Sequence, residues 1–131
     1  MQPLPALITI LALILYFILT LNVGKARSKY GIHPPATTGN EEFERRYRVQ
    51  MNTLEHIVIF LPTLWICALI WPAPHAASLF GIIWIVGRIM YAIGYYKEPA
   101  LRTKGFFLSV FATVALTLGS LIGIMKAFLV G

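Results

Sequence analysis

The chain has 131 residues, of which 58% are hydrophobic and only 12% are charged, and its mean hydropathy is +0.75. A soluble domain has about 25% charged residues, so this composition excludes a disordered chain, an ordinary nucleic-acid-binding domain and a soluble globular protein. Lys and Arg number 11 against 5 Asp and Glu. In so apolar a chain, we interpret the excess of Lys and Arg as a signal that sets the orientation of the protein in a membrane.

Four apolar stretches approach the length of about 20 residues that a helix needs to cross a bilayer. They predict an all-α integral membrane protein, a single domain over residues 1–131 with helices at about 4–23, 42–71, 76–96 and 105–130. The connection Pro72-Ala73-Pro74-His75 predicts an antiparallel hairpin, so we expect a four-helix up-down bundle. The first stretch has no basic segment before it and no small-residue cleavage site after it, which argues against a signal peptide.

Basic residues are concentrated on one side of the expected bundle. The connection after the first stretch, residues 24–46, is expected to be long and irregular because it contains Pro34-Pro35 and Thr37-Thr38-Gly39. Its segment Glu41-Glu42-Phe43-Glu44 is expected to begin the next helix, because carboxylates stabilise a helix N-terminus. The positive-inside rule places the basic side in the cytoplasm and both termini opposite. Nine of the eleven basic residues lie there, namely Lys25, Arg27, Lys29, Arg45, Arg46, Arg48, Lys97, Arg102 and Lys104.

Two of the expected helices carry polar side chains that a lipid-facing helix would not keep. Each set falls on one helical face, with spacing i, i+4, i+7 in the second helix and i, i+3, i+7 in the third. An ionised side chain at membrane depth costs about 2.5–3.5 kcal/mol, so such groups face a bundle interior or a wet cavity. Antiparallel neighbours would bring the sets together near Arg27 and Arg102. The two sets are Arg48, Asn52 and Glu55, and Arg88, Tyr91 and Tyr95.

The residue types leave two interpretations of these polar faces open. Guanidinium groups hold carboxylates bidentately, and a buried glutamate suits an ammonium group, so a small zwitterion with more than one carboxylate would fit. Alternatively, the same groups join the helices through hydrogen bonds worth roughly 0.6–2 kcal/mol each. No metal site is expected, because His33 and His75 fall in separate loops. Cys67 lies in an apolar run and is expected in the core.

The string from Glu42 to Glu55, EFERRYRVQMNTLE, resembles the signature of the MAPEG family, the membrane-associated proteins of eicosanoid and glutathione metabolism. The resemblance extends to PPATTG at 34–39, FLPTLW at 60–65, RIMYAIGY at 88–95 and Leu101-Arg102, and covers most of residues 21–109. The R-x-Q-x-N-x-x-E and R-x-x-Y-x-x-x-Y blocks are similar to those of the branch that contains the microsomal glutathione transferases and the leukotriene-C-forming synthase.

That resemblance implies a homotrimer of four-helix subunits, with glutathione as co-substrate bound between neighbouring subunits near the cytoplasmic face. It implies a hydrophobic electrophile or a lipid hydroperoxide as the second substrate, drawn from membrane lipid, and neither a metal nor a nucleic acid. By position, Arg102 matches the arginine that holds the glutathione sulfur as a thiolate. The positions that match the glutathione-binding pattern are Arg27, Arg48, Gln50, Asn52, Glu55, His56, Arg88, Tyr91 and Tyr95.

The role implied for Arg102 agrees with elementary chemistry. A free thiol with a pKa of about 8.5 is mostly protonated at neutral pH, and only its thiolate is a good nucleophile. A neighbouring guanidinium favours the charged form without losing its own proton. Ser28 and His56 stand where the leukotriene-forming branch has an arginine and a tyrosine. We therefore expect a broader glutathione transferase that also reduces lipid hydroperoxides, rather than leukotriene synthesis.

Two other functions are compatible with the sequence. One is a non-catalytic lipid-binding or scaffold protein of the same fold. The other is a small four-helix exporter, for which the membrane-embedded Glu55 would be the coupling residue. Either a bacterial inner membrane or the endoplasmic reticulum would accommodate the chain, with the active site toward the cytoplasm.

Overall fold

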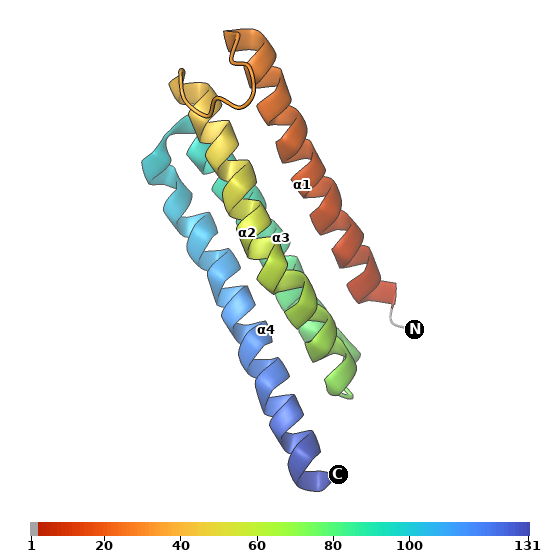
Figure 1. Cartoon of the computed structure of the whole chain (residues 1–131). Coiled ribbons are helices and arrows are strands. Elements are labelled where there is room, and N and C mark those ends of the chain that lie inside the picture. The colour runs from red at the N-terminus through yellow and green to blue at the C-terminus, as the bar shows by residue number, and fades with distance from the viewer. Residues whose placement is uncertain (1–2) are drawn as a thin grey trace.

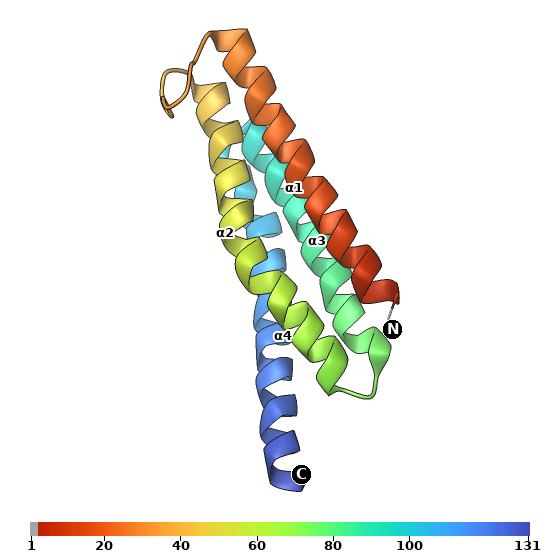
Figure 2. The same cartoon turned by 45° about the vertical axis from the view of Figure 1, so that its right-hand side comes forward.

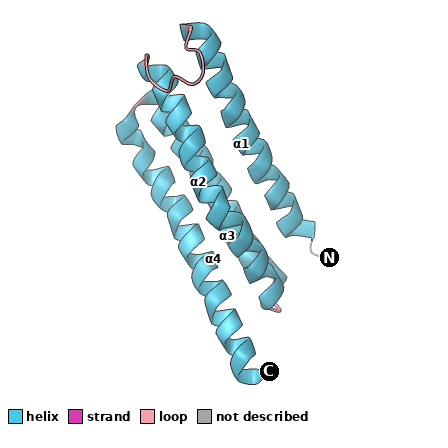
Figure 3. Cartoon of the chain, in the orientation of Figure 1, coloured by secondary structure: helices cyan, strands magenta, loops and turns pink. Residues whose placement is uncertain are grey.

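The computed structural model describes residues 3–131 and consists of four long helices joined by short connections (Figures 1 and 3). The helices are α1 (Pro3–Tyr30), α2 (Glu41–Ile70), α3 (Pro74–Lys97) and α4 (Thr103–Val130), and a short 3-10 helix, η1 (Pro99–Arg102), precedes α4. All four long helices are long and apolar enough to cross a membrane. The predicted all-α, four-span architecture is confirmed.

The helices run alternately up and down, with α2 and α3 in the centre. Helices α1 and α4 lie on opposite sides of this central pair (Figures 1 and 2). Both chain ends lie at the lower end of the bundle in Figure 1, and the α1–α2 and α3–α4 connections lie at the upper end. The upper end is therefore the basic one, and we call it the basic end.

The first helix is longer than its apolar stretch predicted. We expected it to end near residue 23, but α1 continues to Tyr30, and the irregular connection is only residues 31–40. Lys25 and the basic residues after it are thus helical, since backbone hydrogen bonding does not stop where side chains become polar. The helix ends at Gly31, whose φ of +64° is easily adopted only by glycine. The Ile32 N–H then donates to the Arg27 carbonyl at 3.0 Å, as in a Schellman motif.

The second helix begins where the carboxylates predicted. Asn40 is its N-cap, and the Asn40 side chain accepts a hydrogen bond from the Phe43 N–H at 3.1 Å. Glu41 and Glu42 occupy the first turn, where the helix dipole favours negative charge. This start fixes the register of α2 and so the face on which its later polar residues lie.

The core joins α2, α3 and α4 through large side chains and one very close backbone contact. The rings of Phe60 and Trp84 stack with centroids 4.0 Å apart, and both residues are fully buried. Toward the basic end, a Cβ added at Gly105 would lie 2.2 Å from the backbone nitrogen of Tyr91. Only glycine allows α4 to approach α3 this closely, and this contact places the first turns of α4 beside Tyr91.

We expect Phe60→Ala to lower the free energy of unfolding by about 3–5 kcal/mol, because it leaves a cavity against Trp84. Thermal unfolding in detergent micelles would measure the loss. Phe17→Ala is the matched control, since Phe17 is 61% exposed on α1 and faces lipid or detergent. Equal losses in the two variants would contradict the stacked core.

Candidate functional site

A cavity of about 480 Å³ opens near the basic end, between α2, α3 and the start of α4. Its volume is within the range of about 300–1,000 Å³ that is typical of small-molecule sites. Five residues singled out from the sequence contribute to its wall, from three different helices. The lining residues are Arg48 and Asn52 of α2, Tyr91 and Tyr95 of α3, Arg102 of η1, and Thr103, Phe106 and Phe107 of α4.

The α2 wall presents an arginine that is held by a glutamate on the same helix. Arg48 Nη1 donates to Glu55 Oε1 at 3.0 Å. Both side chains are about half exposed, at 51% and 54%, so solvent weakens the ion pair and leaves it worth little as a source of stability. The ion pair instead positions Arg48. The contact with Glu55 keeps the Arg48 guanidinium beside the cavity, and the other N–H groups of Arg48 stay free for a ligand.

The opposite wall presents Arg102 from the short helix η1. A Cβ at Gly94 would lie 2.3 Å from the Leu101 carbonyl oxygen, so glycine there lets η1 pack directly on α3. Arg102 Nη1 donates to the Pro99 carbonyl at 2.7 Å, and its guanidinium carbon lies 5.7 Å from the centre of the Tyr95 ring. A hydrogen bond and an aromatic ring thus orient Arg102 at the cavity, facing the α2 wall.

Arg88 lies behind the cavity and does not line it. The Arg88 side chain is fully buried, and its guanidinium carbon lies 4.4 Å from the centre of the Tyr91 ring. It donates to Asn52 Oδ1 at 2.8 Å, to Ser109 Oγ at 2.9 and 3.1 Å, and to Thr53 Oγ1 at 3.4 Å. Within residues 3–131, no carboxylate forms an ion pair with this buried cation.

The bond from Arg88 determines what Asn52 offers to a ligand. Because the Asn52 carbonyl oxygen already accepts from Arg88, the donors on Asn52 Nδ2 remain for the cavity. Arg48, Arg102 and the buried Arg88 give the region three positive charges against the single carboxylate of Glu55. The cavity therefore favours an anionic ligand that accepts hydrogen bonds.

Four further residues singled out from the sequence do not line the cavity, namely Glu55, Gln50, Arg27 and His56. Glu55 lies next to it through its ion pair with Arg48. Gln50 donates to Thr20 Oγ1 at 3.1 Å and to Tyr16 OH at 3.5 Å, between α2 and α1. Arg27 donates to the Ala36 carbonyl at 2.8 Å and holds the α1–α2 connection. The His56 ring contacts the Phe106 ring edge-on, with centroids 5.5 Å apart. The chain does not bring Arg27 or Gln50 to its own cavity, and the assignment of these residues to a ligand stays a prediction.

Helix α4 contributes residues to the site that were not predicted from the sequence. Thr103, Phe106 and Phe107 line the cavity, and Ser109 accepts from Arg88. A signal was present, because Gly105 and Ser109 are small residues at i and i+4, a spacing typical of close helix packing. The helix-joining interpretation of the polar faces holds for Arg88, which bonds to side chains of α2 and α4. Arg48 and Arg102 line a cavity, and the binding of a ligand there stays a prediction.

We expect Ser109→Ala to destabilise the bundle by about 1.5–3 kcal/mol, because hydrogen bonds to a charged group are lost inside the protein. Ser120→Ala is the matched control, since Ser120 donates only to the neutral Thr63 carbonyl, at 3.1 Å. Its loss should be about 1 kcal/mol. Thermal unfolding of both variants in one detergent provides the comparison, and a smaller loss for Ser109→Ala than for Ser120→Ala would refute the dependence on Arg88.

Comparison with known proteins gives a consistent result. The sequence model of the MAPEG family matches residues 5–122. An uncharacterized protein of Synechocystis sp. is 52% identical over 121 residues, which cover 92% of this chain and 88% of the relative. Microsomal glutathione S-transferase 2 of Homo sapiens is 43% identical over 109 residues, covering 83% and 74% of the two chains. Leukotriene C4 synthase of Cavia porcellus is 35% identical over 124 residues, covering 95% and 82%.

Proposed function

This chain belongs to the MAPEG family, and from that premise we propose that it is a membrane-bound glutathione transferase that joins glutathione to hydrophobic electrophiles. It is a multi-pass integral membrane protein. The observation that carries the proposal is the convergence of Arg48, Asn52 and Arg102 on one cavity at the basic end. Relatives named as a glutathione transferase and as leukotriene C4 synthase support it.

Glutathione has the groups that this cavity can recognise. The tripeptide carries two carboxylates, one ammonium group and one thiol. Arg48 and the Asn52 amide supply donors for a carboxylate, and the half-exposed Glu55 beside them supplies an acceptor for the ammonium group. Arg102, on the facing wall, is left for the sulfur. In this arrangement most of the polar groups position the tripeptide, and one activates it.

The proposed chemistry begins with the thiol. The Arg102 guanidinium stabilises the thiolate, and the thiol proton passes to water. The thiolate sulfur attacks the electrophilic carbon, a carbon–sulfur bond forms, and the bond to the leaving group breaks with its electron pair. With a lipid hydroperoxide, the sulfur attacks the terminal oxygen and becomes a sulfenic acid. The oxygen–oxygen bond breaks with its electron pair on the lipid oxygen, which takes a proton from water and leaves as the lipid alcohol. A second glutathione then converts the sulfenic acid to the disulfide and water.

An apolar path along α4 supports delivery of the second substrate from the membrane. Phe106 and Phe107 form the apolar part of the cavity wall. Phe107 is 63% exposed, and Phe111, one turn further along α4, is 56% exposed. A hydrophobic electrophile dissolved in lipid can thus reach the thiolate without crossing water.

The alternative functions fit the site less well. In an exporter, Glu55 would have to load a cationic substrate, but the cavity beside it is lined by Arg48 and Arg102, whose charges repel cations. A non-catalytic lipid-binding protein would not need an arginine held beside the sulfur position. Calorimetry that detects no glutathione binding to the purified protein would favour the scaffold function and refute the transferase.

The positions of Arg27 and Gln50 support a site that is shared between copies of the chain. Arg27 belongs to α1 and Gln50 donates to Thr20 of α1, so neither lines the cavity of its own chain. We therefore propose that they contribute to the cavity of a neighbouring subunit in a homotrimer. The basic end would face the cytoplasm, in agreement with the positive-inside rule and with the source of glutathione.

Arg102→Ala should abolish thiolate formation while glutathione binding largely survives. At pH 7 the thiolate fraction of bound glutathione should fall to about 3%, the value for a free thiol with a pKa of about 8.5. The ultraviolet difference absorption of the thiolate measures this fraction, and calorimetry measures binding. Lys104→Gln is the control, because it removes a cation two residues away that does not line the cavity. Unchanged turnover in Arg102→Ala would remove Arg102 from the mechanism.

Complementation tests whether the site is shared. Arg27→Ala and Arg102→Ala homomers should both be inactive, but random mixing of the two chains should restore about one quarter of the sites, because a head-to-tail interface takes one residue from each neighbour. The transferase activity of the co-purified mixture, compared with that of each homomer, measures the fraction of restored sites. Recovered activity also demonstrates that both variants fold. If thermal unfolding of the mixture is normal and activity stays absent, Arg27 does not act across the interface.

A further inference from the structure

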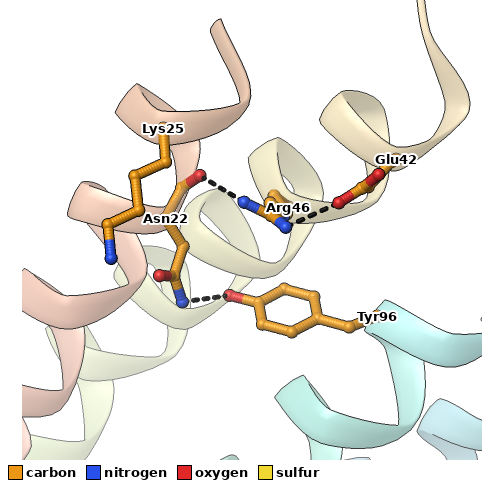
Figure 4. Close-up of a pocket in the computed structure, with 5 residues that line it drawn as sticks. All are labelled: Asn22, Lys25, Glu42, Arg46 and Tyr96. Atoms are coloured by element: carbon orange, nitrogen blue, oxygen red, sulfur yellow. Dashed lines mark hydrogen bonds and ion pairs between the residues drawn. The ribbon is translucent and has the colours of Figure 1, made fainter. Parts of the chain in front are cut away.

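The basic end has a second cavity, of about 350 Å³, which shares no lining residue with the first. Figure 4 shows its wall, made by Asn22 and Lys25 of α1, Glu42 and Arg46 of α2, and Tyr96 of α3. None of these residues has a part in the proposed transfer reaction. The cavity therefore calls for an explanation of its own.

A hydrogen-bond network fixes three walls of this cavity. Arg46 donates to the Asn22 backbone carbonyl at 3.2 Å and to Glu42 Oε1 at 2.6 Å, and Asn22 Nδ2 donates to Tyr96 OH at 3.2 Å (Figure 4). The Glu42 carboxylate also accepts from the Tyr30 hydroxyl and lies 3.7 Å from Lys29 Nζ. Its negative charge is thus fully compensated and does not repel an anion in the cavity.

The groups left over are mainly donors. The Tyr96 oxygen already accepts from Asn22, so its proton is free for a ligand. The Lys25 ammonium group, on the same side of α1 as the Asn22 amide in Figure 4, has no partner among residues 3–131. Since Arg46 cancels Glu42, Lys25 leaves the cavity with a net positive charge. An anion with several acceptor oxygens, such as a phosphate group, fits this set.

The surface of α1 next to the cavity is suited to a lipid. Lys25 also borders a shallow groove with Leu21 and Gly24, and a Cβ at Gly24 would meet nothing within 4 Å. Ile14, Ile18 and Leu21 are 50%, 48% and 48% exposed. They are spaced i, i+4, i+7, so they form an apolar stripe on one helical face, and Lys25 follows on that face. A water-soluble phosphate compound would have no use for this stripe.

We propose that the second cavity binds the phosphate group of an anionic glycerophospholipid from the leaflet at the basic end. Lys25 supplies the charge, the Tyr96 hydroxyl supplies a second donor, and an acyl chain lies along the stripe of Ile14, Ile18 and Leu21. The site is separate from the glutathione cavity, and the proposal does not depend on the transferase activity.

Electron paramagnetic resonance of spin-labelled lipids tests this proposal on the full chain in phosphatidylcholine vesicles. The fraction of motionally restricted label gives the association of phosphatidic acid relative to phosphatidylcholine. The native chain should prefer phosphatidic acid. Lys25→Gln should lower that preference about fivefold, the effect of one lysine near an anionic surface, and Tyr96→Phe should lower it by a similar factor. Lys25→Arg and the control Lys104→Gln should retain it.

Several results would overturn the assignment. An equal fall in Lys104→Gln would show that surface charge in general attracts the lipid. Release of the labelled lipid by millimolar glycerol 3-phosphate would make a soluble phosphate compound the ligand, and no preference in the native chain would refute the site. Glutathione binding, measured on the same samples, should be unchanged by Lys25→Gln. If the native chain bound no glutathione, the lipid preference would still be measured, so the two proposals fail separately.

Discussion

The burial of Arg88, which has no carboxylate partner among residues 3–131, is the constraint on which the basic half of the bundle depends. A guanidinium at this depth must have its N–H groups satisfied by protein, because lipid offers no acceptor. Asn52 and Thr53 of α2 and Ser109 of α4 supply the acceptors, so one side chain of α3 joins three helices. These bonds fix the relative depth of α2, α3 and α4, and a shift of any of these three helices along its axis would leave the cation unsatisfied.

The same constraint gives the first cavity its chemical character. Arg88 donates to the Asn52 side-chain oxygen, so the Asn52 Nδ2 donors are left for a ligand. The positive charge of Arg88, behind the cavity wall, adds to the charges of Arg48 and Arg102. The backbone contact at Gly105 completes the arrangement by bringing Phe106 to the same cavity. Two arginines and an apolar wall thus border the same cavity, which is what the proposed reaction between a polar thiol and a lipid-dissolved substrate requires.

Helices α2 and α3 separate two polar cavities of different construction. In the first, cations on facing walls are held apart by contacts within their own elements, such as Arg102 with Pro99. In the second, the charges of Glu42 and Arg46 neutralise each other. Of the charged residues that line this cavity, only Lys25 has no ion-pair partner within the described part of the chain. Each cavity thus has a net positive charge, one between α2 and α4 and the other beside α1, as the two proposed anionic ligands require.

The sequence by itself determined the four spans, the up-down order, the start of α2 and the two polar helical faces. These follow from local properties, namely apolar length, capping and the helical period. Only the tertiary structure decided that Arg88 is buried while Arg48 and Arg102 line a cavity, because burial depends on which helix covers a face. It also decided that Lys25 of α1 and Tyr96 of α3 line one cavity. Contacts between distant segments depend on packing, which helical spacing does not encode.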